Sequence, residues 1–185
     1  MSTIQVFLPL DIDRFLRREC PYCKREFKIE VPDELLRQED EKFTAEYMVE
    51  AEENTQITQA NEKEMNCPYC GQVAPANHWF TIEQLSYIQA LAMNWCIENL
   101  NREVLEKMQK RFSCRSRGTR MKFSKQKLKT ANAWINLERN DMRLIELPCC
   151  NVRLKILENW KEKIYCIECG FPHENSRIVD YQERQ

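Results

Sequence analysis

The chain carries two copies of one short motif, Cys20-Pro21-Tyr22-Cys23 and Cys67-Pro68-Tyr69-Cys70, and Gly71 follows the second copy. Two Cys-x-x-Cys pairs supply four thiolates, and a tetrahedron of four thiolates is a ligand set that Zn²⁺ favours. In such a turn, backbone N–H groups point at the sulfurs and stabilise the negative charge. The sequence therefore predicts one metal site formed by the four cysteines of the two copies, with zinc favoured over iron.

A second, partly matching set of cysteines lies near the C-terminus: Cys149, Cys150, Cys166 and Cys169. Fifteen residues separate Cys150 from Cys166, which is within the range of zinc ribbons. When the stretch from Leu147 to Cys150 is aligned on its proline, leucine takes the position of the first ligand and Cys149 takes a spacer position. Either the adjacent cysteines both bind metal, or His173 supplies the fourth ligand, or the site is lost and packing alone remains. We expect a second metal ion, and so two Zn²⁺ ions per chain.

Composition limits the class of protein. The chain has 185 residues, of which 43% are hydrophobic and 31% are charged, with a formal net charge of −1. This is a soluble globular composition without an apolar stretch of about 18 residues, so we expect no membrane partner. The first residues lack the basic start and apolar centre of a signal peptide. We therefore expect a cytoplasmic protein, and in that compartment paired cysteines indicate metal or redox chemistry.

The charges are unevenly placed along the chain. Residues 33–64 carry eleven Asp or Glu and three Lys or Arg, whereas residues 110–129 carry nine Lys or Arg and no acidic residue. Phosphate contacts need such basic charge, and the interleaved Phe112 and Phe123 can stack on unpaired bases. Alternatively, the basic run is a solvated linker, or it pairs with residues 33–64 of the same chain. The residues predicted to bind nucleic acid are Lys110, Arg111, Arg115, Arg117, Arg120, Lys122, Lys125, Lys127 and Lys129.

Hydrophobic periodicity predicts both strands and helices. Strands are expected over residues 4–10, 25–31, 142–147, 152–157 and 163–165, where apolar and polar residues alternate or form short runs. A helical turn is expected after Asp11 or Asp13, and a helix is expected in the acidic segment from residue 33 to 51. Thr81 and Gln84 form a capping box that begins a long helix, expected to continue to Phe112. Cys96, within that helix, is expected to be a small buried apolar group.

These elements predict an α+β fold with two small zinc-ribbon β modules joined by a long central α-helix and a basic connector. The expected divisions are an N-terminal ribbon with an acidic helical insertion, the helix, the connector and a C-terminal ribbon-like module: residues 1–80 (insertion 33–64), 81–112, 113–141 and 142–185.

The cysteine motifs and the strand after the first one resemble the zinc-ribbon superfamily, over residues 18–31, 65–75 and 142–172. The resemblance implies a metal-stabilised β module. It also implies a role as a nucleic-acid-binding or protein-binding module of the kind found in transcription, replication and translation machinery.

The sequence lacks a phosphate-binding glycine loop, a histidine-rich metal site with an open position and a convincing nucleophile–base pair. We therefore expect a protein that is not an enzyme and has no small-molecule substrate. The leading hypothesis is a non-catalytic zinc protein that binds nucleic acid through the basic segment and a ribbon surface. The alternative is an adaptor or accessory subunit of a larger protein complex. A third hypothesis is thiol redox chemistry through Cys114 or through Cys166 and Cys169.

Overall fold

The computed structural model describes residues 3–32, 36–39, 42–50, 64–105, 127–174 and 179–180. The elements follow in chain order: β1 (Thr3–Pro9), β2 (Phe15–Glu19), β3 (Glu26–Glu30), β4 (Leu36–Glu39), β5 (Lys42–Glu50), β6 (Glu64–Asn66), β7 (Val73–Pro75), a 3-10 helix (Ala76–His78), α1 (Ile82–Asn99), a π-helical segment (Leu100–Leu105), β8 (Arg143–Leu147), β9 (Val152–Ile156), β10 (Ile164–Tyr165), β11 (Pro172–His173) and β12 (Val179–Asp180).

The chain forms two compact units. The first consists of Met1–Leu85 and Ile135–Gln185, and the second of Ser86–Trp134. Every strand of the described residues belongs to the first unit, whereas the second holds most of α1. The structure is therefore α+β, with small antiparallel β modules.

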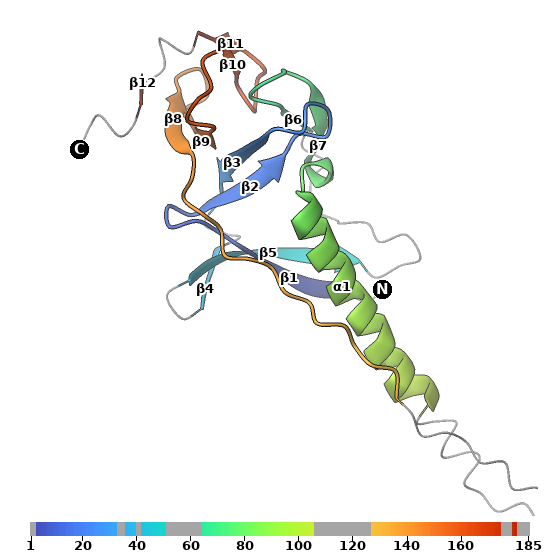
Figure 1. The fold of residues 1–185 in the computed structure, drawn as a ribbon. Coiled ribbons are helices and arrows are strands. Elements are labelled where there is room, and N and C mark those ends of the chain that lie inside the picture. Colours follow the sequence, from blue (N-terminus) through green and yellow to red (C-terminus); the bar gives the residue numbers. More distant parts are fainter. Residues whose placement is uncertain are drawn as a thin grey trace, which may run out of the picture. The chain divides into compact units, whose positions relative to one another are not determined.

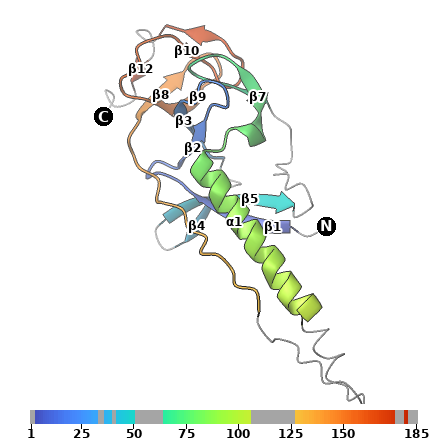
Figure 2. The ribbon, with the colours of Figure 1, turned by 45° about the vertical axis from the view of Figure 1, so that its right-hand side comes forward.

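A five-stranded antiparallel sheet, in the order β12-β8-β9-β3-β2, is the main sheet of the first unit. Strands β2, β3, β8 and β9 lie side by side in both ribbon views (Figures 1 and 2). Strand β3 pairs with β9 through Lys28↔Lys155 and Ile29↔Leu154. Because β3 follows the first cysteine motif and β9 follows the adjacent cysteines of the second cluster, the two ribbon-like modules share one sheet.

Each pair of cysteines lies in the turn of a β-hairpin. The four hairpins are β2–β3, β6–β7, β8–β9 and β10–β11. The first two carry the N-terminal cysteines, and the last two carry the C-terminal cysteines. The molecule is thus built from two modules of two hairpins each, and both modules use the same order of hairpins.

The two modules are related by a local pseudo-twofold arrangement, which the backbone hydrogen bonds between β6–β7 and β10–β11 make visible. Asn66 and Tyr165 hold equivalent positions, since each directly precedes the first cysteine of its hairpin. The N–H of Asn66 donates to the carbonyl of Ile167 at 2.9 Å, and the N–H of Tyr165 donates to the carbonyl of Pro68 at 2.9 Å. The two hydrogen bonds are reciprocal, because Pro68 and Ile167 each follow the first cysteine.

The glycines in the turn of the second hairpin of each module are related in the same way. Gly71 has φ +70° and Gly170 has φ +71°, a region that side chains with a Cβ rarely adopt. A Cβ on Gly71 would lie 3.1 Å from the Tyr165 ring, and one on Gly170 would lie 2.9 Å from Oδ1 of Asn66. Each module therefore needs a glycine at this position, because the side chain of Asn66 or Tyr165 from the other module approaches it closely.

One hydrophobic core serves both modules. Its buried members come from both halves of the sequence: Cys20, Phe27, Cys67, Tyr69, Ala74, Trp79, Ile145, Leu147, Leu154, Ile156, Ile164, Cys166 and Ile167. Phe27 packs edge-on against Trp79, with ring centroids 5.7 Å apart, and against Tyr69 at 6.4 Å. The hydroxyl of Tyr69 donates to the carbonyl of Glu26 at 2.7 Å and accepts from the N–H of Leu157 at 3.0 Å. Tyr69 thus joins the two modules through hydrogen bonds as well as packing.

The helix predicted in the acidic segment is wrong. Residues 36–39 and 42–50 form β4 and β5, which pair with each other, and β5 also pairs with β1 along seven residue pairs from Thr3↔Glu50 to Pro9↔Thr44. The apolar residues Phe43, Tyr47 and Val49 fit a strand period as well as a helix period. Pairing with the edge of β1 favours the strand conformation over the helix. The remainder of the segment, apart from Glu64, lies outside the described residues.

Two further expectations are also wrong. In place of the helical turn expected after Asp11 or Asp13, Phe15 and Leu16 begin β2, and both are fully buried. Asp11 instead closes a turn, where its Oδ1 accepts from the N–H groups of Asp13 and Phe15, each at 3.0 Å. Cys96 is exposed, because it lies on the side of α1 that nothing in the second unit covers among the described residues.

The remaining strands and the helix start are confirmed. Thr81 Oγ1 accepts from the N–H of Gln84 at 3.2 Å, and Gln84 Oε1 accepts from the N–H of Thr81 at 3.0 Å, which is the predicted capping box. Helix α1 ends at Asn99 and continues as the π-helical segment to Leu105. The predicted extension to Phe112 lies outside the described residues.

Candidate metal centres

The N-terminal cluster, defined as Cys20, Cys23, Cys67 and Cys70, brings the two copies of the motif together. Its four sulfurs lie within 4.8 Å of one another. Sγ of Cys20 is 3.7 Å from Sγ of Cys70, and Sγ of Cys23 is 3.7 Å from Sγ of Cys67. A tetrahedral zinc with Zn–S bonds of about 2.3 Å separates its sulfurs by about 3.8 Å. The cluster is therefore positioned to hold a metal ion of this size and geometry.

The hairpin turns also stabilise the thiolates of the N-terminal cluster. The N–H of Cys23 donates to Sγ of Cys20 at 3.4 Å, and the N–H of Tyr69 donates to Sγ of Cys67 at 3.4 Å. Cys20 and Cys67 are fully buried, and burial raises the pKa of the Cys67 thiol far above its usual value. A buried thiol of this kind becomes a stable thiolate when a cation neutralises it, so the environment suits a bound metal ion.

The C-terminal cluster, defined as Cys149, Cys150, Cys166 and Cys169, also places its four sulfurs within 4.8 Å of one another. Sγ of Cys169 lies 3.6 Å from Sγ of Cys149, again close to the edge of a zinc–thiolate tetrahedron. A backbone hydrogen bond from Phe171 lowers the pKa of Cys169 to about 7. Cys149 and Cys169 are exposed. The cluster can hold a metal ion, but in a more open position than the N-terminal cluster.

His173 contacts the C-terminal cluster from β11. Its Nε2 lies 3.1 Å from Sγ of Cys149. An imidazole nitrogen and a thiolate sulfur on the same tetrahedral zinc would be separated by about 3.6 Å, given Zn–N of about 2.05 Å and Zn–S of about 2.3 Å. The shorter observed distance fits a hydrogen bond between Nε2 and the sulfur. The structure thus brings together all five candidates named from the sequence.

The pairing of the strands explains why the two clusters differ. Arg18 faces Phe27 across β2–β3, and Ile145 faces Leu154 across β8–β9. Two residues further toward the turn, Cys20 follows Arg18 in the first hairpin and Leu147 follows Ile145 in the second. Leu147 therefore occupies the position of Cys20, which is the equivalence that the alignment on proline predicted. Both residues are fully buried. The fourth cysteine of the C-terminal cluster is instead Cys149.

The position of Cys149 corresponds to that of Tyr22. The turns of the two hairpins are alike, because Lys24 has φ 59° and Asn151, its counterpart, has φ 52°. Tyr22 is 59% exposed, so this position points outward in the N-terminal module. The outward position of Cys149 accounts for part of the greater exposure of the C-terminal cluster. Cys169 is exposed as well, whereas Cys70, at the equivalent position, is half-buried.

A buried group of charges lies between the two modules, and sequence analysis did not identify it. Lys28 and Lys155, which face each other across β3 and β9, are 0% and 1% exposed. Oδ2 of Asp11 accepts from Nζ of both lysines, at 3.2 and 2.8 Å. Lys155 also contacts Asp13 at 2.5 Å and donates to Asn140 at 2.7 Å. A buried cation needs such partners, so these charges fix the segments around Asp11 and Asn140 on the sheet.

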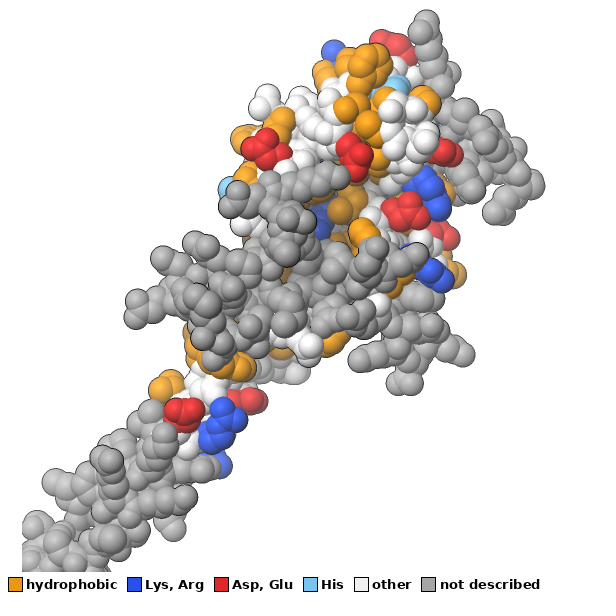
Figure 3. All heavy atoms as spheres, turned by 180° about the vertical axis from the view of Figure 1, so that it is seen from behind, with side chains coloured by type: hydrophobic (Ala, Val, Ile, Leu, Met, Phe, Trp, Pro, Cys, Tyr) orange, Lys and Arg blue, Asp and Glu red, His pale blue; other side chains and the backbone are white. Residues whose placement is uncertain are grey.

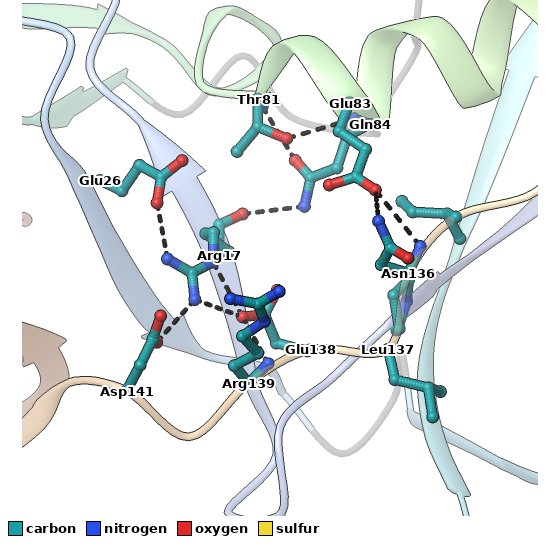
Figure 4. Close-up of a pocket in the computed structure, with 12 residues that line it drawn as sticks. Arg17, Glu26, Thr81, Glu83, Gln84, Asn136, Leu137, Glu138, Arg139 and Asp141 are labelled. Carbon is teal, nitrogen blue, oxygen red and sulfur yellow. Dashed lines mark hydrogen bonds and ion pairs between the residues drawn. The ribbon is translucent and has the colours of Figure 1, made fainter.

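Arg17 extends this charged group into a polar cavity of about 250 Å³ (Figure 4). Its guanidinium contacts Glu26 at 2.6 Å, Glu138 at 2.7 Å and Asp141 at 2.6 Å. Burial alone would raise the pKa of Asp141, but the hydrogen bond and charge of Arg17, with the charge of Lys28, hold it below its ordinary value. The cavity is lined by Pro9, Arg17, Glu26, Thr81, Glu83, Gln84, Ile135, Asn136, Leu137, Glu138, Arg139 and Asp141.

Most of the residues predicted to bind nucleic acid lie outside the described residues: Lys110, Arg111, Arg115, Arg117, Arg120, Lys122 and Lys125. Lys127 and Lys129 are described, and both are exposed. Cys114 is also outside the described residues. On the face drawn in Figure 3, acidic and basic side chains of the described residues are interspersed with hydrophobic ones.

In the second unit, an asparagine of α1 and one of the π-helical segment bind the backbone of residues 128–131, the extended segment. Asn94 exchanges two hydrogen bonds with the backbone of Ala131, both at 2.8 Å. Asn101 does the same with Leu128, both at 2.9 Å. Seven helical residues rise about 10.5 Å, and three extended residues span about 10 Å. The two asparagines are therefore spaced to bind an extended backbone, whatever its side chains are.

Searches of protein-family models, curated proteins and solved structures gave no match to this chain. Among the described residues, no helix combines the length and apolar character that crossing a membrane requires.

Proposed function

We propose that this protein is a non-catalytic zinc-binding protein whose two zinc ions hold one β-sheet scaffold for a macromolecular partner. The observation that carries the proposal is the distance between neighbouring sulfurs, 3.7 Å for two pairs of the N-terminal cluster and 3.6 Å for the pair Cys149 and Cys169, which matches the edge of a zinc–thiolate tetrahedron. A zinc ion with four thiolate ligands has no open position for water or substrate. Its role is then to stabilise the fold.

At the C-terminal cluster we assign all four cysteines as ligands, so that Cys149 and Cys150 both bind the metal. His173 acts as a hydrogen-bond partner of the Cys149 sulfur, because its distance of 3.1 Å is too short for two ligands of one tetrahedral zinc. Such partners orient a ligand and tune its basicity.

The partner that we propose first is nucleic acid. The basic run over residues 110–129 supplies the charge. The surface of the two ribbon-like modules adds aromatic rings that lie beside cationic side chains. The guanidinium of exposed Arg25 lies 4.8 Å from the Trp160 ring, and Nζ of exposed Lys163 lies 5.4 Å from the Tyr165 ring. Rings and cations of this kind bind unpaired bases and phosphates. Since the described charges are mixed in sign, the basic run is expected to provide most of the affinity.

Fluorescence anisotropy with a labelled single-stranded oligonucleotide tests this partner. Changing Arg115, Arg117 and Arg120 together to glutamate should weaken binding and flatten its dependence on salt. A matched control changes Arg37, Lys42 and Lys63, the basic residues of the acidic segment, to glutamate and alters the net charge equally. Equal losses in the two triple variants, or no loss in the first, would contradict a nucleic-acid role for the basic run.

A second candidate function, a protein adaptor, is favoured by the second unit. Met93, Cys96 and Leu100 share one side of the helix, and all three are exposed. Leu128, on the extended segment, and Trp134 are 52% and 66% exposed. Exposed apolar side chains gathered on a small unit are typical of a protein-binding surface.

Light scattering and the binding of a hydrophobic dye test the adaptor candidate. The adaptor predicts dye binding that falls when Met93 and Leu100 are changed together to lysine. Lysine at Ile12, which is 78% exposed in the first unit, serves as the control. A monomeric chain that does not bind the dye would contradict the adaptor.

A further inference from the structure

We infer that the C-terminal cluster is a site of reversible oxidation by a hydroperoxide, in which Cys149 forms a disulfide with Cys169 and zinc is released. This inference rests on the proposed zinc ligands. It extends them, because it assigns the two clusters different chemistry: the N-terminal zinc is permanent and the C-terminal zinc is conditional.

The first support is exposure. A thiolate reacts with peroxide only when the peroxide can reach the sulfur. Cys149 and Cys169 are both exposed, whereas no cysteine of the N-terminal cluster is. Two of the N-terminal cysteines, Cys20 and Cys67, are fully buried.

The second support is proximity. The two exposed sulfurs of the C-terminal cluster are also neighbours, since Sγ of Cys149 lies 3.6 Å from Sγ of Cys169. A sulfenic acid formed on either residue would therefore meet the other thiolate without a large movement of the chain. Such an adjacent resolving thiol is what makes cysteine oxidation reversible.

The third support is the position of Cys149 in its hairpin. It stands at the outward position that Tyr22 holds in the N-terminal module, while the inward position of Cys20 is held by Leu147. The C-terminal cluster thus uses an outward ligand where the N-terminal cluster uses a buried one. This exchange of one position accounts for the exposure of Cys149, the first of the two cysteines that form the disulfide.

The step balances with the peroxide as oxidant. Two zinc-bound thiolates lose two electrons, the O–O bond of the peroxide breaks, and an S–S bond forms between Cys149 and Cys169. Two protons from solvent complete two molecules of water when the oxidant is hydrogen peroxide. Zinc keeps its charge and loses two of its four ligands, so its affinity for the remaining cluster falls and it dissociates.

The test begins with the full chain loaded with zinc, in which Cys96 and Cys114 are changed to serine because they belong to neither cluster. Hydrogen peroxide is added in limited amount, released zinc is followed with a chromogenic chelator, and disulfides are mapped by differential alkylation and mass spectrometry. We expect one zinc ion to be released per chain, with a Cys149–Cys169 disulfide. A dithiol reductant and added zinc should restore the starting state.

A position-exchange variant provides the matched control. Leu147→Cys together with Cys149→Tyr gives the C-terminal hairpin the ligand pattern of the N-terminal hairpin. With the fourth thiolate moved to the buried position, we expect peroxide-dependent zinc release to slow by about tenfold or more. If this variant fails to bind its second zinc, the disulfide map of the parent chain still decides the question.

Three results would overturn the inference: loss of both zinc ions at the same rate, a disulfide that omits Cys149, or a position-exchange variant that binds two zinc ions and is as sensitive as its parent. A purified chain that never holds zinc would contradict the proposed function itself. The zinc content before peroxide is added therefore separates the two failures.

Discussion

The N-terminal and C-terminal clusters share a design and differ in one position. Both join two hairpins, both bring four sulfurs within 4.8 Å of one another, and each has a glycine of positive φ after its last cysteine. The N-terminal cluster takes a ligand from the buried position at Cys20, and the C-terminal cluster takes one from the outward position at Cys149. A shift of two residues along a turn thus places one of the four cysteines at the surface, and Cys169 adds a second exposed sulfur to the C-terminal cluster.

The two modules are also joined through equivalent parts, so that one small core serves both clusters. The modules pair through equivalent strands, β3 and β9, and through reciprocal hydrogen bonds from Asn66 and Tyr165. Since the two modules share one core, a substitution in either cluster can alter the packing around the other.

The largest effect should come from the buried ligands. Cys67→Ser is expected to prevent folding, because a structural zinc site contributes on the order of 10 kcal/mol in small zinc domains and Cys67 is also part of the core. Cys169→Ser, in the open cluster, should leave a folded chain with a lower melting temperature and one zinc ion. Circular dichroism and zinc content measure both. Equal damage from the two variants would contradict the difference between the clusters.

The next effect concerns the charges that lie between the modules. Asp11→Ala removes a carboxylate that contacts both Lys28 and Lys155 at 3.2 and 2.8 Å, and loss of a partner in a buried ion pair costs about 3–5 kcal/mol. Asp13→Ala is the control, because Asp13 is 47% exposed and contacts Lys155 only from the surface; its cost should be under about 1 kcal/mol. Denaturant unfolding gives the free energies, and similar values for both would show that the buried charges do not join the modules.

The two tyrosines of the repeated motif allow a finer test. Tyr69→Phe removes the hydroxyl that donates to Glu26 and accepts from Leu157, with an expected cost of about 1–3 kcal/mol. Tyr22→Phe removes a hydroxyl that contacts Val73 at 3.2 Å from an exposed position, and it should cost less than about 0.5 kcal/mol. A reversed order in denaturant unfolding would contradict the role of Tyr69 as the residue that joins the modules.

The smallest difference between two matched variants should come from the equivalent glycines. Alanine at Gly71 or Gly170 must adopt φ near +70°, at a cost of about 1–2 kcal/mol. Gly71→Ala should be the more destabilising, since its Cβ meets the ring of Tyr165. At Gly170 the Cβ meets the end of the Asn66 side chain, which can move away at the loss of two hydrogen bonds of 3.3 Å to the carbonyls of Ile167 and Glu168. Thermal unfolding of the two variants decides the order, and a more stable Gly71→Ala variant would contradict it.

The sequence predicted the local elements better than their pairing. Cysteine spacing identified both clusters, and alternation identified β3, β8 and β9, because these signals depend on residues close together in the chain. The pairing of β3 with β9 joins residues more than 120 positions apart and leaves no local signal. The strand β5 was mistaken for a helix for the same reason, since the edge of β1 that selects it is distant in sequence. No local sequence pattern predicts that Lys28 and Lys155 are buried, because isolated lysines are usually solvated.

The central claim is that two zinc ions, each held by four thiolates, support one shared scaffold. Native mass spectrometry of the purified chain, combined with elemental analysis and thiol titration, tests it most directly. We predict two zinc ions per chain and only two titratable thiols, those of Cys96 and Cys114, until a chelator is added. One zinc ion with six reactive thiols, or iron in place of zinc, would contradict the claim.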